Sequence, residues 1–174
     1  MENCVVIYKS KTGFTEKYAN WIAEALGCEV YPLENVNLVH LADYDVIIFG
    51  GGVRAGKING VKFVETTRNS FPHKKLVFFA TGAAPADESE TVERVRKMNV
   101  PRNSAIPFFY FQSGFNYEKM KGFDRVIMTM VRNMMRRTKD KDGTRDDMIS
   151  AMKNSYDHSS RESIEPLVNY VRAL

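Results

Sequence analysis

The sequence of 174 residues has few of the residues that hold metal ions, with only two cysteines and three histidines. His40, His73 and His158 are widely spaced, and no CxxC motif or cysteine–histidine cluster occurs, so we expect no metal site. Cys4 and Cys28 each lie among strand-forming residues, where a buried thiol packs as a small apolar side chain. A redox pair is the alternative, and it requires the first two strands of the fold to be neighbours.

Long apolar runs are also missing. No run reaches the roughly 18 residues that a membrane-spanning helix needs, and Met1–Cys4 lacks the basic flank and apolar core of a signal peptide. With 44% hydrophobic and 26% charged residues, the composition is typical of a globular protein. We therefore expect a cytoplasmic protein whose residues 1–174 form a single domain.

Acidic residues do not balance the basic ones, and the net charge is +4. Residues 117–141 contain 8 basic and 3 acidic residues, a net charge of +5, whereas the rest of the chain contains 17 and 18, a net charge of −1. The sequence lacks basic residues interleaved with stacking aromatics, the pattern of a nucleic-acid-binding surface. We expect no nucleic-acid partner.

Short apolar or β-branched runs alternate along the chain with segments of helical spacing. The runs predict strands at Val5–Tyr8, Glu29–Tyr31, Asp45–Phe49, Lys75–Ala80 and Ile106–Phe111. The helical segments are Thr15–Leu26, Val61–Thr67, Glu90–Met98 and Ser160–Ala173. This alternation predicts an α/β fold with a doubly wound five-stranded parallel sheet in the order 2-1-3-4-5 and helices on both faces. Ligands of such sheets bind at the carboxyl ends of the strands.

Only residues 112–158 break this alternation, and we interpret them as an insertion before the last helix. Apolar residues recur there at three- and four-residue spacing, which predicts an amphipathic helix from Lys119 to about Arg137 with a basic surface. One interpretation is a helix packed on the core with a solvated basic face. The other is a methionine-rich basic helix, within residues 117–141, that contacts an anionic partner, a substrate or a membrane surface.

The segment Ser10-Lys11-Thr12-Gly13-Phe14-Thr15 joins the first predicted strand to the first predicted helix. Three hydroxyl side chains and a glycine meet the start of a helix there, where backbone N–H groups are unpaired and the helix dipole adds partial positive charge. This combination predicts a site for a dianionic phosphate, with the hydroxyls as additional donors. The alternative is structural: Thr12 or Thr15 caps the helix, and Gly13 turns the chain.

The longer segment Tyr8-Lys9-Ser10-Lys11-Thr12-Gly13-Phe14-Thr15 resembles the FMN phosphate loop of flavodoxins, and the resemblance extends over nearly all of the chain. It implies a flavodoxin-like protein that binds FMN non-covalently and transfers electrons, with Ser10–Thr15 holding the ribityl phosphate. It also implies that Gly51-Gly52-Val53-Arg54-Ala55-Gly56 and Thr81-Gly82-Ala83-Ala84 surround the isoalloxazine ring.

Both predicted ring segments are rich in small residues. Gly50-Gly51-Gly52 allows the backbone to approach a flat ring closely and permits positive φ. Gly82, Ala83 and Ala84 leave room for an aromatic heterocycle. Backbone amides of these segments are the expected hydrogen-bond partners of the ring, which carries the redox chemistry.

Two other phosphate-binding motifs overlap the first ring segment. Gly51–Lys57 spells GxxxxGK, but Ile58 stands where a P-loop requires Ser or Thr. Gly50–Ala55 fits GxGxxA, a dinucleotide-binding pattern, but no predicted helix opens at the required place. A nucleoside triphosphatase and a dehydrogenase are therefore disfavoured.

The ring segments differ from those of typical flavodoxins, which stack the flavin between aromatic side chains. Neither Gly50–Lys57 nor Thr81–Glu88 contains Phe, Tyr or Trp, so we expect one flavin face to be open to another molecule. A segment similar to Phe123–Met128 occurs in the quinone-linked protoporphyrinogen oxidase branch of flavodoxin-like proteins. That resemblance implies an alternative to an electron carrier: an FMN-dependent oxidoreductase of protoporphyrinogen oxidase or quinone reductase type, acting on a bulky aromatic substrate.

The expected partner is a redox protein or a quinone-like small molecule, and peripheral membrane contact through residues 117–141 is a further hypothesis. Arg54 is the best single candidate for contact with the flavin or an anionic substrate, with an ordinary surface arginine as the alternative. We assign no residue a catalytic role. A flavodoxin fold without flavin, used as a binding module, is the third interpretation.

Overall fold

The computed structural model describes residues 3–101, 105–115 and 155–174. The chain divides into two compact units: Met1–Ser113 with Ser159–Leu174, and Gly114–His158. The bounds of the second unit lie close to those of the predicted insertion, 112–158. The amphipathic helix predicted within residues 117–141 lies outside the described residues.

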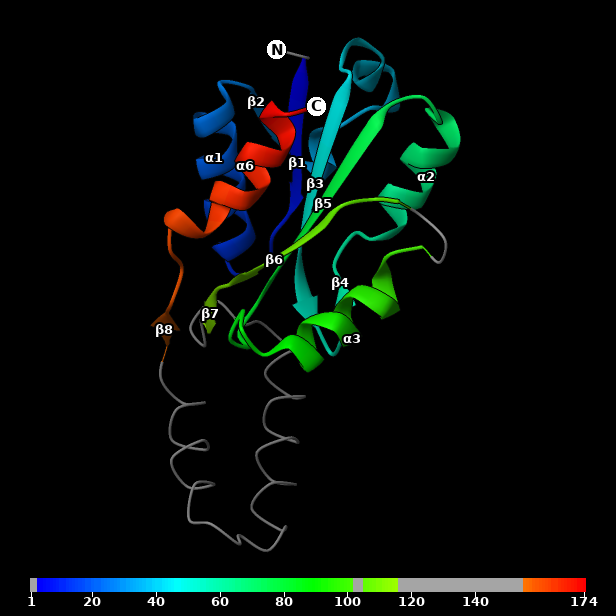
Figure 1. The fold of residues 1–174 in the computed structure, drawn as a ribbon. Coiled ribbons are helices and arrows are strands. Elements are labelled where there is room, and N and C mark those ends of the chain that lie inside the picture. Colours follow the sequence, from blue (N-terminus) through cyan, green and yellow to red (C-terminus); the bar gives the residue numbers. More distant parts are fainter. Residues whose placement is uncertain (1–2, 102–104, 116–154) are drawn as a thin grey trace, which may run out of the picture. The chain divides into compact units, whose positions relative to one another are not determined.

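A parallel sheet forms the centre of the first unit (Figure 1). Its strands are β1 (Cys4–Lys9), β2 (Glu29–Pro32), β3 (Val46–Arg54), β5 (Lys75–Gly82) and β6 (Phe108–Gln112). They follow the order β2-β1-β3-β5-β6, and every neighbouring pair is parallel. This is the predicted doubly wound order 2-1-3-4-5 of a flavodoxin-like α/β fold. A short further strand, β4 (Lys57–Ile58), pairs antiparallel with the end of β3.

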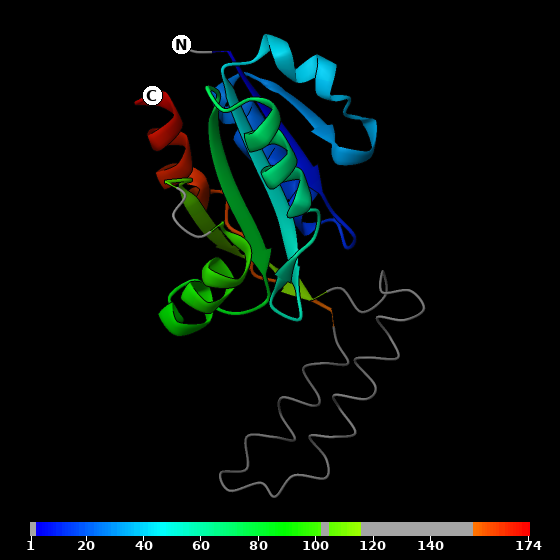
Figure 2. The same ribbon diagram turned by 90° about the vertical axis from the view of Figure 1, so that its right-hand side faces the viewer.

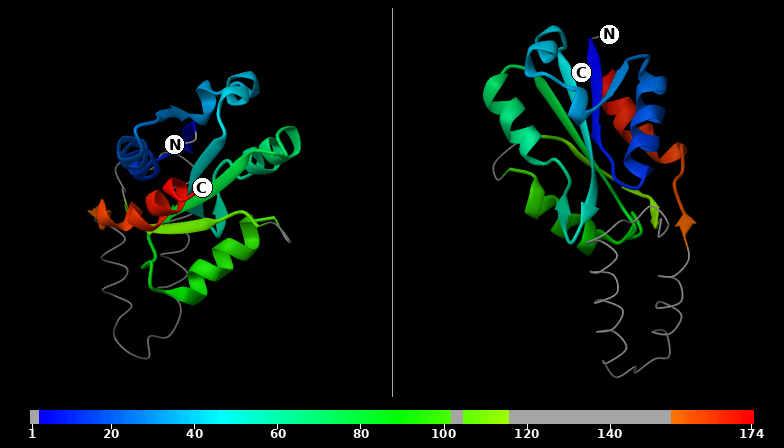
Figure 3. Two further views of the ribbon diagram at one scale, coloured as in Figure 1. Left: turned by 45° about the horizontal axis from the view of Figure 1, so that its top comes forward. Right: turned by 180° about the vertical axis from the view of Figure 1, so that it is seen from behind.

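Helices cover both faces of this sheet, as Figures 2 and 3 show from other sides. One face carries α1 (Phe14–Leu26) and α6 (Glu165–Arg172), and the other carries α2 (Lys62–Ser70) and α3 (Ser89–Asn99). Each pair of helices encloses its own cluster of buried apolar residues against the strands. Because the inner strands β1, β3 and β5 are covered on both faces, their buried parts are continuously apolar rather than alternating.

Helix α1 has a glycine in the left-handed region at each end. Gly13, the N-cap residue, has φ 93°, and Gly27, the C-cap residue, has φ 66°; residues with a Cβ avoid both conformations. At the carboxyl end, the N–H of Cys28 donates to the carbonyl of Ala23 at 3.0 Å. This bond closes the helix and turns the chain directly into β2.

Strand β3 is longer than predicted. We expected it to end at Phe49, but it extends to Arg54 because Gly50–Gly52 continue to pair with β1 and β5. A Cβ at Gly50 would lie 1.9 Å from Cζ of Phe79, so this glycine makes room for a core aromatic ring. The other predicted elements are present with small shifts at their ends, and the last one begins as a 3-10 helix, Glu162–Ile164, before α6.

In the second unit, the structure describes a two-stranded antiparallel ribbon of β7 (Gly114–Phe115) and β8 (Tyr156–Asp157). Among the described residues of the whole chain, no helix is both long enough and apolar enough to cross a membrane. The same residues contain no group of three or more His, Cys, Asp or Glu side chains placed to hold a metal ion.

Candidate functional site

The predicted phosphate loop follows β1 at the carboxyl end of the sheet (the lower end of the strands in Figure 1). The N–H of Gly13 donates to Oγ of Ser10 at 3.1 Å, which folds the loop back on itself. The first bond of α1 runs from the N–H of Lys17 to the carbonyl of Gly13 at 3.0 Å. The N–H groups of Phe14 to Glu16 therefore have no acceptor within the helix, and they form the positive end of its dipole.

No side chain of the loop caps these donors. The N-cap residue is Gly13, which has no side chain to cap the helix. Ser10 and Thr12 are half-buried and Lys11 is exposed. The structural alternative, in which Thr12 or Thr15 caps the helix, is thus disfavoured: neither is the N-cap residue, and Thr15 is bonded elsewhere.

Three predicted segments converge at one point. Oγ1 of Thr15 and Oγ1 of Thr81 are 2.7 Å apart, and both side chains are buried. Gly52 pairs with Thr81 in the sheet, and a Cβ at Gly52 would lie 3.3 Å from Oγ1 of Thr15 and 3.9 Å from Oγ1 of Thr81. The carboxyl ends of β1, β3 and β5 therefore meet at one place, the end of the sheet at which ligands of such folds bind.

The first ring segment, Gly51–Gly56, is part of a β-hairpin rather than an irregular loop. Arg54 pairs with Lys57, and the two residues between them, Ala55 and Gly56, have φ of 47° and 78°. Two consecutive positive φ values in a two-residue connection indicate a type I′ turn. Gly50–Gly52, whose sequence permits positive φ, do not adopt it, because these glycines are paired strand residues.

A buried amide that the sequence analysis missed holds this hairpin. Nδ2 of Asn99 donates to the carbonyls of Gly56 and Val95 at 2.7 Å each, and Oδ1 of Asn99 accepts the N–H of Ile58 at 2.8 Å. Asn99 is 7% exposed at the end of α3. Asn99 lies four positions after Val95 and one residue beyond the predicted helix Glu90–Met98, so its only signal in the sequence was that spacing from an apolar helix residue.

The second ring segment, Thr81–Ala84, is contacted by an aromatic side chain from β6. The hydroxyl of Tyr110 donates to the carbonyl of Ala84 at 3.1 Å. A Cβ at Gly82 would lie 2.4 Å from that hydroxyl oxygen, so a larger residue there would displace the Tyr110 side chain. Neither ring segment contains an aromatic residue. Tyr110 of β6, the strand next to β5, places an aromatic side chain beside Thr81–Ala84.

The remaining predicted residues lie at the rim. Arg54, Ala55 and Ala83 are exposed, whereas Val53 and Ala84 are half-buried. Arg54 stands at the end of β3, next to the turn.

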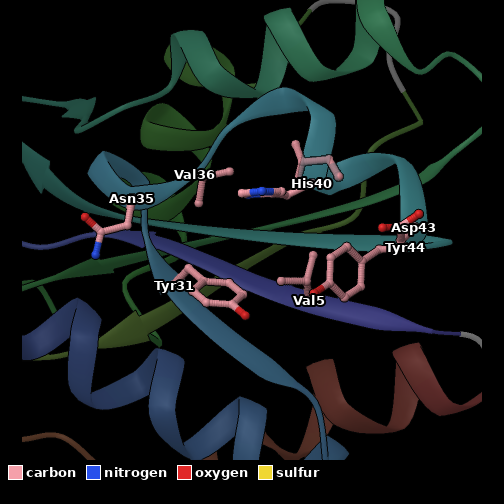
Figure 4. Close-up of a pocket in the computed structure, with 8 residues that line it drawn as sticks. Val5, Tyr31, Asn35, Val36, His40, Asp43 and Tyr44 are labelled. Carbon is pink, nitrogen blue, oxygen red and sulfur yellow. The ribbon is translucent and has the colours of Figure 1, made fainter.

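A hollow of about 400 Å³ lies elsewhere, between β2 and the 3-10 helix Leu38–Asp43 (Figure 4). Tyr31 and Tyr44 line it, and the Tyr44 hydroxyl donates to Glu29 at its edge. Hydrogen bonds from the Tyr44 and Tyr31 hydroxyls lower the pKa of Glu29, while the Glu29 carboxylate raises the pKa of Tyr44. None of the predicted site residues lines this hollow.

Known proteins resemble this chain in sequence and in fold. An uncharacterized protein of Methanocaldococcus jannaschii is 33% identical over 82 residues, which are 47% of this chain and 55% of that protein, so the match spans about half of the relative. A reduced Megasphaera elsdenii flavodoxin has 20% identity and a TM-score of 0.44, covering 62% of this chain and 82% of that one. The WrbA-like flavodoxin of Agrobacterium tumefaciens has 20% identity and a TM-score of 0.44, covering 80% and 100%.

The family comparison covers most of the sheet and the predicted site. Residues 5–142 match the flavodoxin domain, a range that begins in β1 and includes all three converging segments. The chain therefore belongs to the flavodoxin domain family.

Proposed function

We propose that the chain binds FMN non-covalently at the carboxyl ends of β1, β3 and β5 and functions as an electron-transfer flavoprotein. The observation that carries this proposal is the convergence of Thr15, Gly52 and Thr81. One cofactor can contact all three segments only if they lie next to one another. The Thr15 and Thr81 hydroxyls are within hydrogen-bond distance of each other, and a Cβ at Gly52 would lie within 4 Å of both.

The chain's residues fit the phosphate of FMN. Ser10 and Thr12 offer hydroxyl donors, and the first-turn N–H groups of α1 offer backbone donors without an intrahelical acceptor. The dipole of a 13-residue helix adds partial positive charge at the same end. The exposed ammonium group of Lys11 adds charge at the rim.

In this proposal, the isoalloxazine ring of FMN lies between the hairpin and the Thr81–Ala84 segment. Gly52 leaves its backbone open, and Ala83 and Ala84 present small side chains. The Asn99 amide fixes the hairpin, and Tyr110 fixes the turn, so the two walls are held by separate hydrogen bonds. When bound, FMN supplies one- and two-electron redox chemistry, while the chain binds and orients it.

The proposal is tested on freshly purified full-length protein. We expect a yellow protein whose absorption spectrum is that of a flavin and which releases close to one FMN per chain on denaturation. Apoprotein should regain the spectrum when FMN is added, and its melting temperature should rise because a ligand that binds only the folded state stabilises it. A colourless protein that takes up no FMN would remove the proposal and favour a binding module.

A second candidate is an FMN-dependent oxidoreductase of protoporphyrinogen oxidase or quinone reductase type. It is favoured by the lack of aromatic residues in Gly50–Lys57 and Thr81–Glu88, which leaves room for a second flat molecule beside the ring. Anaerobically reduced protein is mixed with a menaquinone analogue, and oxidised protein with protoporphyrinogen. Fast, saturable turnover with either supports the enzyme, and turnover with neither leaves the electron carrier, whose partner is a redox protein.

A further inference from the structure

The two cysteines of the chain lie side by side at the amino ends of neighbouring strands, Cys4 in β1 and Cys28 immediately before β2. Val5 of β1 pairs with Glu29 of β2, and Cys4 and Cys28 immediately precede them, so the parallel register sets Cys4 opposite Cys28. The bond from the N–H of Cys28 to the carbonyl of Ala23 fixes the chain at this point. The condition for a redox pair, neighbouring first strands, is therefore met.

The spacing of the pair suits a disulfide. Neighbouring strands lie about 4.8 Å apart, within the roughly 4.4–6.8 Å between Cα atoms that disulfides span. Both side chains pack against the same buried cluster beneath α1, so they project from the same face of the sheet. The register of the strands and the shared buried cluster therefore place the two thiols on one face at opposed positions.

Solvent reaches the pair from the amino end of the sheet, away from the candidate FMN crevice. Cys4 is 5% exposed, and Cys28 is half-buried. Both line an open hollow of about 640 Å³ together with Leu26, Gly27 and Glu29. A small reagent therefore meets Cys28 first, with Cys4 directly behind it.

We propose that Cys4 and Cys28 form a thiol–disulfide redox site that exchanges with low-molecular-weight disulfides. The Cys28 thiolate attacks one sulfur of the small disulfide, whose S–S bond breaks and releases one thiol after protonation. Cys4 then loses its proton and attacks the Cys28 sulfur of the mixed disulfide, which releases the second thiol. The two protein thiols give up two electrons and two protons, and the small disulfide accepts them as two thiols.

The surroundings determine the rate of this exchange. Burial raises the pKa of the Cys28 thiol, and the neighbouring Cys4 thiol raises it further. Only the thiolate attacks, so exchange is slow near neutral pH and accelerates as the pH rises. The same high pKa makes Cys28 a poor leaving group, so the disulfide is reduced slowly once it has formed.

The bond would close a ring from Cys4 to Cys28 that contains Ser10–Thr15 and the whole of α1. A covalent ring restricts the unfolded chain more than the folded one, which stabilises the fold. We therefore expect oxidised protein to melt several degrees above reduced protein, and the difference to disappear when a dithiol reductant is added.

The test uses reduced full-length protein equilibrated anaerobically with mixtures of reduced and oxidised glutathione. After an acid quench, free thiols are labelled with N-ethylmaleimide and the intact mass is measured. We expect an unlabelled species, two hydrogen atoms lighter than the reduced chain, that grows with the oxidised share of the buffer, and a peptide map that joins Cys4 to Cys28. Its rate of formation should rise with pH.

Single-cysteine variants separate the two steps. Cys4→Ser should retain one glutathione on Cys28, because the resolving thiol is missing, and Cys28→Ser should react much more slowly. The wild-type result decides the proposal even if a variant fails to fold. Two labelled thiols at every glutathione ratio, a mixed disulfide that never resolves in the wild type, or a cross-link that forms only in urea would each overturn it.

Discussion

Thr15 and Thr81 are 66 residues apart in the sequence, yet their hydroxyl oxygens are 2.7 Å apart in a buried position. Thr15 lies in the first turn of α1, and Thr81 lies near the end of β5, so this hydrogen bond joins the predicted phosphate loop to a predicted ring segment. Gly52, which contributes no side chain, lies beside both. The contact holds the start of α1 against the end of β5.

A double-mutant cycle measures this contact. Thr15→Val or Thr81→Val should each lower the free energy of unfolding by about 1–3 kcal/mol, because the remaining hydroxyl is buried without its partner. The double variant should cost less than the sum, since no orphaned hydroxyl remains. Urea denaturation of apoprotein measures the free energy of unfolding of the two single variants and the double variant. Thr66→Val, at an exposed position of α2, is the control. Strictly additive losses would contradict a direct Thr15–Thr81 interaction.

Two glycines of α1 form a matched pair for testing the phosphate loop. Gly13→Ala and Gly27→Ala both introduce a Cβ at positive φ, at a cost of about 1–2 kcal/mol. No atom lies within 4 Å of a Cβ at Gly27, so that variant reports backbone strain alone. Only Gly13→Ala should also weaken FMN binding, because it distorts the loop that holds the phosphate. Equal FMN affinities for the two variants, measured by fluorescence quenching, would argue against that loop as the phosphate site.

Loss of the Asn99 amide should loosen the hairpin. Asn99→Ala removes three hydrogen bonds and leaves the N–H of Ile58 without its acceptor, so we expect a loss of about 2–3 kcal/mol. Asn69→Ala, at an exposed position of α2, is the control and should change stability by less than about 0.5 kcal/mol. If the hairpin forms one wall of the flavin crevice, Asn99→Ala apoprotein also binds FMN more weakly. Unchanged FMN affinity in a folded variant would show that the wall lies elsewhere.

The turn of the same hairpin contains a strained residue. Ala55 has φ 47°, a conformation that alanine adopts at a cost and asparagine tolerates. Ala55→Asn creates the Asn-Gly pair that type I′ turns prefer, and it should raise the free energy of unfolding by about 0.5–1 kcal/mol. Ala86→Asn, at an exposed turn residue without positive φ, should not. Equal effects of the two substitutions would mean that turn geometry is not the cause.

The tyrosine–glutamate contact predicts a pH dependence. Hydroxyl donors lower the pKa of Glu29 in the folded protein below its ordinary value of 4.5. The carboxylate therefore stabilises the fold above that value, and the contribution is lost as the pH falls through the folded-state pKa. Glu29→Gln should lower the melting temperature at neutral pH and have little effect in acid, whereas Glu65→Gln serves as an exposed control. If Glu29→Gln lowered the melting temperature equally at both pH values, the lowered pKa of Glu29 would be contradicted.

The sequence predicted the order of the sheet because each buried strand is a continuous apolar run and each helix has a clear apolar face. It did not predict the hairpin, since Ala55-Gly56 lacks the Asn-Gly signal of a type I′ turn and three consecutive glycines resemble a loop. Gly50 is explained only by the ring of Phe79, which is distant in sequence. Asn99 and Tyr110 act on segments that lie far from them along the chain, so local patterns did not reveal them.

The central claim is that the loop after β1 holds the phosphate of FMN, and one comparison tests it most directly. Apoprotein is titrated with FMN and with riboflavin, which has the same ring and no phosphate, and flavin fluorescence is followed. We predict that FMN binds at least about 100-fold more tightly, the equivalent of about 2.7 kcal/mol. Equal affinity for the two flavins, or binding of neither, would contradict the account.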